Sequence, residues 1–311
     1  MKITFVISLY YHFTKNKMQR DFCLGSDWLY YKIYTGVKTA DHILVEKLKN
    51  VIYDLEQKKY IKKWFFIRYR DPEEHIRIRF LLDDGDKLAL VINAFHPIFK
   101  KLMDENVIWK LQTDTYQREI ERYGVATMKD SEILFWKNSK MILEYLTIKN
   151  SFLQIEAPLL FSFLMIDTFL NSFKISTADK LNLMNELQLS FKKEFEIDKI
   201  QRKKMDLKYR SLNPKLDDFF NFSNLNAYTA FFEIVNKNSN DIEETAFKII
   251  NKIEIPIIDF LSSHIHMMIN RQYTSKQRIY ELVIYDHLHR YYKAMNYKLI
   301  QSNDELKATV S

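Results

Sequence analysis

The chain alternates apolar and polar residues most regularly between Trp64 and Phe80, where the pattern predicts a β-hairpin. In the second half of this stretch, successive side chains point to opposite faces of a strand. One face carries Ile76, Ile78 and Phe80, and the other carries His75, Arg77 and Arg79. Residues 71–74 form the predicted turn, because the Pro72 ring presets φ and cannot donate to a sheet.

Strand and helix patterns follow one another through the first half of the chain. Strands are predicted at residues 3–13, 28–34 and 107–116, and helices at residues 39–60 and 87–105. A helical turn at 117–124 is expected to end at Gly124, because glycine adopts left-handed backbone geometry at little cost. Strands covered by two helices are typical of an α+β layer.

From Ser131 onward the pattern is almost entirely helical. Helices are predicted at 131–148, 157–173, 178–200, 224–237, 241–252, 256–273 and 275–297. We therefore predict an α+β fold in which an N-terminal sheet covered by helices occupies residues 1–150. A mainly helical subdomain, residues 151–311, is expected to pack on this layer as part of one functional unit.

Composition narrows the choice of partners and substrates. The chain of 311 residues has only 4 glycines and 5 prolines, and it lacks the glycine-rich phosphate-binding motifs. Its net charge of +7 favours an anionic partner or substrate, but the excess is modest and spread out, so direct binding to nucleic acid is not expected. The densest basic run, residues 199–210, is expected to be a solvated and partly flexible linker, and contact with an acidic partner is the alternative.

The single cysteine, Cys23, excludes an internal disulfide and a cysteine-based metal site. The start of the chain lacks the pattern of a signal peptide, and no apolar run approaches the roughly 18 residues that span a bilayer. His264 and His266 point away from each other on a helix, so they cannot chelate one metal ion together. We expect a cytoplasmic protein without a metal, cofactor or transmembrane segment.

The two hairpin arginines are the first candidates for a site. Arg77 and Arg79 are two residues apart on one strand, so their positions are roughly 6–7 Å apart. Arginine stays charged and can bind a carboxylate through two parallel hydrogen bonds, so the pair could hold both ends of a small dicarboxylate. The alternative is a half-buried strand with a solvated basic face.

Two further groups have helical spacing. Glu119 and Arg122 are three residues apart and can pair, although an ordinary surface ion pair is the alternative. His266 and Asn270 are four apart on one side of a helix, and Arg271 follows. A histidine there could move a proton near neutral pH, and the alternative is a histidine satisfied where two helices pack.

Four stretches in order resemble a known family. They read WFFIRYRDPEEHIRIRF, DTYQREIERYG, SEILFWKNSKMILEYL and SSHIHMMINRQY, and GSDWLYYKIYTGVKTAD at 25–41 matches the usual opening of the same family. Together they resemble the C-terminal elimination domain of class I lantibiotic dehydratases, which also occurs alone in thiopeptide-type bacteriocin biosynthesis proteins. The resemblance covers nearly the whole chain.

The resemblance implies a lyase. In this family a partner domain esterifies Ser or Thr of a precursor peptide with glutamate from glutamyl-tRNA. The elimination domain then removes the Cα proton and expels glutamate, which leaves dehydroalanine or dehydrobutyrine. Glutamylation makes elimination easier, because it replaces a poor leaving group with a better one. Hydroxide is the conjugate base of water, with a pKa of about 15.7, whereas a carboxylate is the conjugate base of an acid with a pKa near 4.

The resemblance also assigns residues. It implies that the catalytic groups are Arg79, Arg122 and His266, and that the substrate-binding groups are Arg77, Glu119, Asn270 and Arg271. Arg77 and Arg79 would bind the glutamyl group, and His266 would act as a general acid or base. Val125 departs from the family, which often has a second glycine there.

The implied partners are a precursor peptide with a leader, a separate glutamyl-tRNA-dependent glutamylation enzyme and, as a further candidate, a cyclase. Two other functions stay open. One is the related [4+2] cycloaddition that joins two dehydroalanines into the pyridine ring of a thiopeptide, although such relatives need not keep the glutamate-binding arginines. The other is a non-catalytic peptide-binding subunit of a modification complex, which would pair an exposed strand with the peptide.

Overall fold

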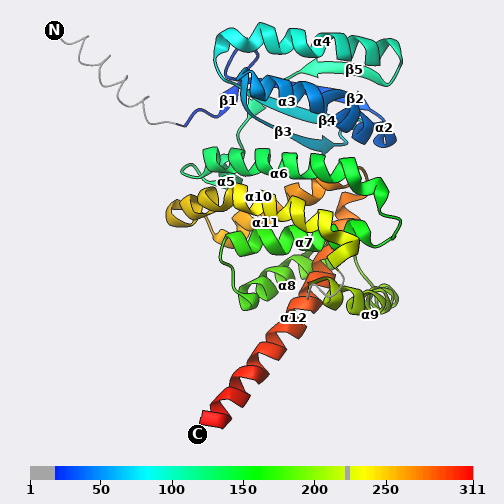
Figure 1. Ribbon diagram of the computed structural model, residues 1–311, viewed down its shortest axis with the longest axis vertical. Helices are drawn as coiled ribbons and strands as arrows, with labels where there is room; N and C mark the ends of the chain where they lie inside the picture. Colours follow the sequence, from blue (N-terminus) through cyan, green and yellow to red (C-terminus); the bar gives the residue numbers. More distant parts are fainter. Residues whose placement is uncertain (1–17, 221–224, 311) are drawn as a thin grey trace, which may run out of the picture.

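A four-stranded antiparallel sheet forms one end of the molecule (Figure 1). This computed structural model describes residues 18–220 and 225–310, with side chains for 18–220 and 227–301. The strand order is β3-β4-β2-β5. The bounds are Trp28–Thr35 for β2, Ile61–Tyr69 for β3, His75–Leu82 for β4 and Ile108–Thr113 for β5. The predicted hairpin is confirmed as β3 and β4, and the strand predicted at 3–13 lies outside the described residues.

Helices cover the two faces of this sheet. On one face Tyr31 and Phe80 pack against Phe95 of α4, with ring centroids 6.4 and 4.9 Å apart. The helix predicted at 39–60 is present in three consecutive pieces, with a π-helical turn in the middle. The bounds are α2 Val37–His42, the π-helix Ile43–Leu48, α3 Lys49–Gln57 and α4 Leu88–Asp104, which a 3-10 turn, Gly85–Lys87, precedes. On the other side α6, Met128–Ile148, runs beneath the sheet, between it and most of the helical half (Figure 1).

A short connection leads from the sheet to α6. Strand β1, Asp21–Phe22, pairs with β6, Tyr116–Gln117, and α5, Ile120–Tyr123, follows. Gly124 ends α5 with φ of 74°, as the sequence predicts. A Cβ at this position would lie 2.8 Å from Thr127 Oγ1, so both the backbone angle and the space favour glycine.

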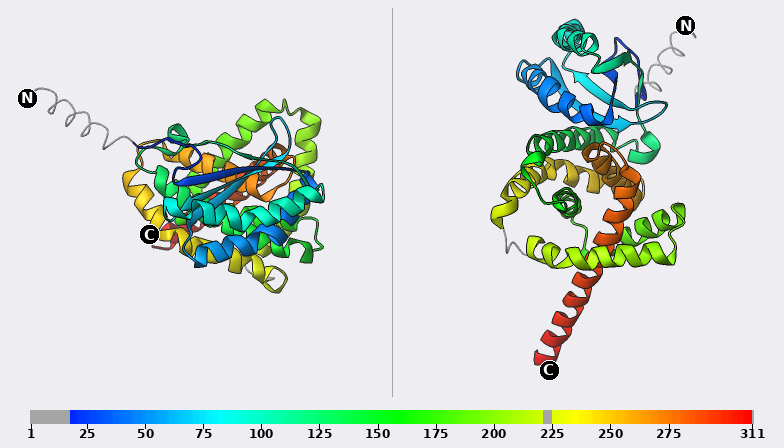
Figure 2. Two further views of the ribbon diagram at one scale, coloured as in Figure 1. Left: turned by 90° about the horizontal axis from the view of Figure 1, so that it is seen from above. Right: turned by 90° about the vertical axis from the view of Figure 1, so that its right-hand side faces the viewer.

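The second half is a bundle of helices, so the predicted α+β class is confirmed. A 3-10 turn, Lys149–Ser151, leads into α7 Ala157–Ser172, α8 Thr177–Glu194, α9 Lys199–Phe220, α10 Leu225–Lys252, α11 Ile257–Gln272 and α12 Gln277–Val310. Helix α7 is buried on nearly every side, and Figure 2 shows it end-on inside a ring of the other helices. None of the described helices is both long and apolar enough to span a bilayer.

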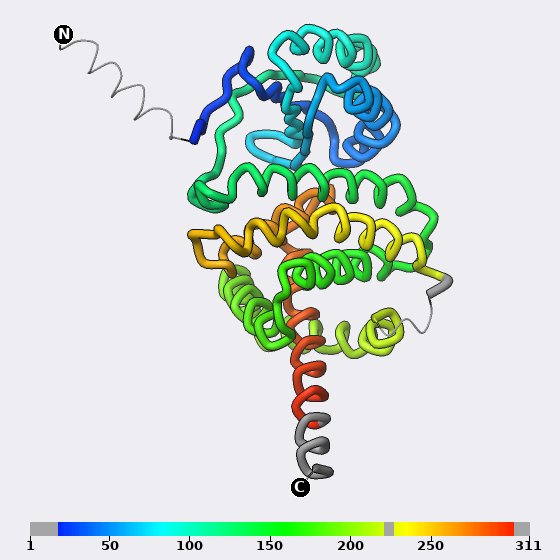
Figure 3. The backbone as a smooth tube through the Cα atoms, turned by 60° about the vertical axis from the view of Figure 1, so that its left-hand side comes forward, coloured from blue at the N-terminus to red at the C-terminus, as the bar shows by residue number. Residues whose placement is uncertain are grey.

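The structure corrects two predictions in this half. The run 199–210 lies in α9 and is not a flexible linker, because the buried Leu212, Leu216 and Phe219 continue the same helix and leave the charges on its outer side. The helices predicted at 224–237 and 241–252 are one helix, α10. No glycine or proline interrupts the segment between them. Helix α12 also runs beyond residue 297 and projects away from the bundle (Figure 3).

Candidate functional site

Several stretches singled out in the sequence meet at one small cavity of about 40 Å³. It lies between the hairpin, the β6–α5 segment, the first turns of α6 and one face of α11. The lining residues are Phe65, Ile67, Arg79, Tyr116, Gln117, Glu119, Tyr123, Met128, Phe135, Met267 and Arg271. The fold therefore brings together three of the seven predicted site residues, Arg79, Glu119 and Arg271.

Arg79 is buried among aromatic rings. Strand alternation points its side chain to the same face as Phe65 on β3 and Tyr30 on β2, which are its neighbours in the ladder. Its Cζ lies 4.2 Å from the Tyr30 ring centroid, 5.1 Å from that of Tyr116 and 5.2 Å from that of Phe65. Only 8% of Arg79 is exposed, so the alternative of a solvated basic face does not hold at this position.

The Arg79 guanidinium is incompletely satisfied. Its Nε is buried and has no hydrogen-bond partner among the described residues. Burial lowers the pKa of Arg79, because a charge removed from water loses hydration, and the ring contacts recover only part of that loss. Arginine nevertheless remains charged at neutral pH, so the cavity holds a buried positive charge.

Arg271 adds a second buried positive charge. It is 1% exposed, its Nε donates to the Phe66 carbonyl at 2.8 Å, and its Nη1 donates to Asn138 Oδ1 at 3.1 Å. Burial lowers the pKa of Arg271, and the nearby charge of Arg79 lowers it further. Both hydrogen-bond acceptors are neutral, so they fix the position of the guanidinium without cancelling its charge.

Asn270 attaches α11 to the edge strand β3. Its Oδ1 accepts from the backbone N–H of Arg68 at 2.9 Å, and its Nδ2 donates to the carbonyl of the same residue at 2.9 Å. An edge strand has free backbone groups, and this side chain pairs one N–H and one C=O of β3. Asn270 is outside the cavity lining, and its geometry fits a role in placing Arg271.

Three of the four predicted site arginines have no close carboxylate among the described residues, and Arg122 is the exception. Within the described part of the chain, eight of twelve arginines have a carboxylate oxygen within 4.0 Å. The four without one are Arg77, Arg79, Arg202 and Arg271, and three of these four are predicted site residues. The site therefore carries positive charge for which the described residues provide no carboxylate within 4.0 Å.

The remaining cationic candidates lie nearer the surface. Arg77 stacks on Tyr69, with Cζ 3.4 Å from the ring centroid, and its Nε donates to His75 Nε2 at 3.0 Å. Arg122 pairs with Glu119, with 3.2 Å between Nε and Oε2, and both side chains are more than half exposed. The predicted pairing of Glu119 with Arg122 is confirmed, and its exposure is that of an ordinary surface ion pair. Neither arginine is among the residues that line the cavity.

His266 lies where α11 meets α12. Its Nδ1 is 2.6 Å from Oε1 of Glu281, and its side chain is 31% exposed. The residue is outside the cavity lining, but the next residue, Met267, belongs to it. The structure thus places His266 at the interface of α11 and α12, outside the cavity lining and partly open to solvent.

Three residues near this site were missed by the sequence reasoning. Tyr116 and Tyr123 line the cavity, and burial raises the pKa of both phenols. Both stand in the quoted DTYQREIERYG stretch, so this motif could have pointed to them. Glu281, the partner of His266, gives no such signal, because it belongs to the next helix.

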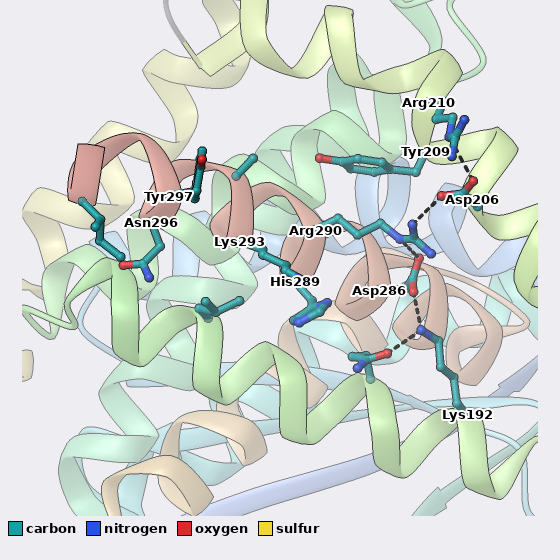
Figure 4. Close-up of a pocket in the computed structure, with 14 residues that line it drawn as sticks. Lys192, Asp206, Tyr209, Arg210, Asp286, His289, Arg290, Lys293, Asn296 and Tyr297 are labelled. Carbon is teal, nitrogen blue, oxygen red and sulfur yellow. Dashed lines mark hydrogen bonds and ion pairs between the residues drawn. The ribbon is translucent and has the colours of Figure 1, made fainter. Parts of the chain in front are cut away.

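A much larger cavity, about 860 Å³, lies between α8, α9 and α12 (Figure 4). Its two carboxylates are already paired. Asp286 contacts Lys192 at 2.5 Å and Arg290 at 2.9 Å, and Asp206 contacts Arg290 at 2.7 Å and Arg210 at 2.9 Å. No group of three or more His, Cys, Asp or Glu in the described chain is arranged to hold a metal ion.

Comparisons with known proteins point to one family. The family model described as lantibiotic biosynthesis dehydratase C-term matches residues 28–292. The subtilin biosynthesis protein SpaB of Bacillus subtilis is 28% identical over 182 residues, which are 56% of this chain and 17% of SpaB. The nisin biosynthesis protein NisB of Lactococcus lactis subsp. lactis is 27% identical over 209 residues, which are 64% of this chain and 20% of NisB. The chain thus spans about a fifth of these relatives.

Solved structures show the same fold. The tRNA-dependent lantibiotic dehydratase MibB from Microbispora sp. 107891 matches with a TM-score of 0.70 at 15% identity, over 86% of this chain and 28% of MibB. The pyridine synthase TbtD from thiomuracin biosynthesis matches with a TM-score of 0.53 at 12% identity, over 88% of this chain and 100% of TbtD. At these identities the likeness concerns the fold alone.

Proposed function

Because the chain belongs to the family of lantibiotic biosynthesis dehydratase C-terminal domains, we propose that it catalyses glutamate elimination in lanthipeptide or thiopeptide biosynthesis. The substrate is a ribosomally made precursor peptide whose Ser or Thr hydroxyl is esterified with glutamate. The products are dehydroalanine or dehydrobutyrine in the peptide and free glutamate. The enzyme is accordingly a lyase.

The unpaired, buried charge of Arg79 supports this proposal most strongly. A buried cation without a counterion is unfavourable until an anion reaches it, and a carboxylate matches the guanidinium in charge and shape. The cavity of about 40 Å³ has room for one small polar group such as a carboxylate, and the rest of the glutamyl group and the peptide extend outside it. Glutamyl esters carry one carboxylate from the start and gain a second on elimination.

The elimination balances without a cofactor. A base takes the Cα proton of the esterified residue, the C–H electron pair forms the Cα=Cβ double bond, and the Cβ–O bond breaks. The electrons of that bond leave with the glutamate carboxylate. Negative charge therefore develops on the leaving group, and positioned positive charges stabilise it in the transition state.

Each predicted residue has a role in this scheme. Arg79 binds a glutamyl carboxylate, Arg77 and Arg271 add positive charge, and His266 transfers a proton. Glu119, which lines the cavity, forms an exposed pair with Arg122, and this pair orients the peptide. Asn270 holds Arg271 in place through its two bonds to β3.

The reaction requires partners. A leader-bearing precursor peptide is the substrate, a separate glutamyl-tRNA-dependent enzyme supplies the ester, and a cyclase is a further candidate that consumes the dehydrated product. Glutamyl-tRNA is made in the cytoplasm, and we propose that this protein acts there too.

Mass spectrometry of a glutamylated precursor tests the proposal. Incubation with this protein should release free glutamate, and each event should leave the peptide one water lighter than the unmodified peptide. His266→Ala should retain the glutamylated peptide. Complete retention of the ester by the wild-type protein, with a precursor from its own pathway, would overturn the proposal.

Cycloaddition is the second candidate, favoured by the likeness in fold to the pyridine synthase TbtD along its whole length. This reaction needs no leaving carboxylate at the start, so it gives no reason for the unpaired charge of Arg79. A dehydrated precursor peptide separates the two functions. Formation of a pyridine ring from it would replace elimination as the activity of this chain.

A further inference from the structure

We propose that Glu281 is a positioning residue for His266, and that it directs His266 Nε2 to act as the base that removes the Cα proton. This inference rests on the proposed elimination and adds to it the identity of the proton-accepting atom. The observation behind it is a buried carboxylate that contacts only one of the two ring nitrogens.

Glu281 is held from both sides. It is 1% exposed, and its Oε1 accepts from His266 Nδ1 at 2.6 Å and from the Tyr285 hydroxyl at 3.0 Å. Its Oε2 accepts from Arg278 Nη1 at 3.0 Å. A carboxylate with hydrogen bonds to both oxygens cannot rotate freely, so it fixes the plane of the imidazole that it contacts.

The contact determines where the imidazole carries its proton. An ionised carboxylate only accepts hydrogen bonds, so the 2.6 Å contact requires the hydrogen to be on Nδ1. A neutral imidazole has a single N–H, which leaves the lone pair on Nε2. His266 Nε2 has no hydrogen-bond partner among the described residues, so this lone pair is available to a substrate.

The surroundings suit a base that becomes charged. When Nε2 takes the Cα proton, the ring becomes an imidazolium, and Glu281 then stabilises that charge across Nδ1. The two helices make this possible, because α11 and α12 are joined by a short turn and bring His266 and Glu281 together from one helix each. Arg278 pairs with Glu281 on the far oxygen and also with the exposed Glu194 at 2.5 Å, so the positive charge of Arg278 is shared by two carboxylates.

Nitrogen-15 NMR of the intact protein tests the tautomer directly. The His266 signals can be assigned by their loss in His266→Gln, among the 8 histidines of the chain. In the neutral ring we expect a protonated Nδ1 and an unprotonated Nε2. Glu281→Gln should weaken this preference, because its amide can donate to Nδ1 and stabilise the opposite tautomer. Glu244→Gln, which removes an exposed carboxylate of α10 that pairs with Lys248, is the control and should leave the His266 signals unchanged.

The kinetic test uses the same variants with a glutamylated precursor. We expect Glu281→Gln to lower kcat by roughly 100-fold, since general-base catalysis contributes 10²–10⁴-fold, while KM changes by less than about twofold. Glu244→Gln should keep both constants. A merely structural Glu281 would instead lower the amount of folded protein and leave the kcat of the folded fraction unchanged.

Two outcomes would overturn the inference. One is a neutral His266 in the wild-type protein with its hydrogen on Nε2, which can be seen even if Glu281→Gln does not fold. The other is a folded Glu281→Gln with wild-type kcat. If the wild-type protein releases no glutamate, the elimination proposal fails, and the NMR experiment still decides whether Glu281 sets the tautomer.

Discussion

Two of the cavities in this protein differ in how their charged side chains are paired, and their volumes alone do not show this difference. The cavity between α8, α9 and α12 measures about 860 Å³, and the one at Arg79 about 40 Å³. In the larger cavity Asp286 and Asp206 are paired with lysine and arginine from neighbouring helices. In the smaller one Arg79 and Arg271 are buried without a carboxylate within 4.0 Å among the described residues.

Charge pairing distinguishes the residues at the larger cavity from those of the proposed site. Paired charges connect the helices at this interface. Removing one partner is strongly destabilising, because the other charge then stays buried without compensation. An unpaired buried guanidinium makes the opposite contribution, since it costs stability until an anion arrives. The comparison therefore favours a structural role for the charges at the larger cavity and supports the proposal that the smaller cavity binds an anion.

The largest expected effect concerns activity. Arg79→Met keeps an unbranched apolar side chain and removes the charge, so it should lower glutamate release by roughly 10²–10³-fold, as the loss of one positioned donor to developing negative charge does elsewhere. Single-turnover mass spectrometry with a glutamylated peptide measures this. Lys293→Met, at the larger cavity, is the matched control and should retain activity. Equal loss in both variants would remove the distinction between the two cavities.

The second prediction concerns stability at the larger cavity. Asp286→Asn should lower the free energy of unfolding by about 3 kcal/mol, because it leaves Lys192 and Arg290 without the carboxylate that both contact. Glutamate release by the folded variant should be unchanged. Urea unfolding measures the difference. A change below 1 kcal/mol would mean that these ion pairs do not hold α8 and α12 together.

The third prediction is that the contribution of Asp286 to the free energy of unfolding depends on pH. Burial acts to raise the pKa of Asp286, but hydrogen bonds from Lys192 and Arg290, together with the nearby His287 ring, outweigh it and hold the pKa well below its usual range. The stabilisation is then fully present above the unfolded value of about 3.9 and is lost as pH falls below it. The stability difference between wild type and Asp286→Asn should therefore be constant from pH 7 to pH 5 and shrink toward pH 3. A difference that grows on acidification would contradict this assignment.

The smallest effect is expected at the exposed pair beside the site. Arg122→Gln should change the free energy of unfolding by about 0–1 kcal/mol, because Glu119 and Arg122 are both largely solvated. Its activity should fall by about tenfold or less, which corresponds to about 1.4 kcal/mol of transition-state energy. A loss as large as that of Arg79→Met would place Arg122 in contact with the reacting group.

The hairpin and its arginines could be predicted because they depend on local rules. A period of two residues fixes the face of Arg79, and Pro72 fixes the turn. The sequence could not predict that Arg79 is buried, because Tyr116 comes from a separate segment and reaches it only through the β1–β6 pair.

Longer-range packing also explains what the sequence reasoning missed. The basic run 199–210 resembles a linker until the buried Leu212 and Leu216 are seen to continue the same helix. Glu281 contacts His266 only because α12 turns back along α11, and no spacing rule connects residues on two helices. Side-chain spacing within the hairpin was predictable from local rules, but the extent of α9 and the contact between two helices were not.

The unfolding free energy of Arg79→Met tests the central claim most directly, which is that this guanidinium is kept for an anion and not for the fold. Its removal ends a desolvation cost of several kcal/mol and loses ring contacts of about 0.5–2 kcal/mol each, so we predict a protein within about 1 kcal/mol of wild type, or more stable. Added glutamate should then stabilise the wild type and leave the variant unchanged. A loss of 3 kcal/mol or more, with no response to glutamate in either protein, would show that Arg79 supports the fold and would contradict this account.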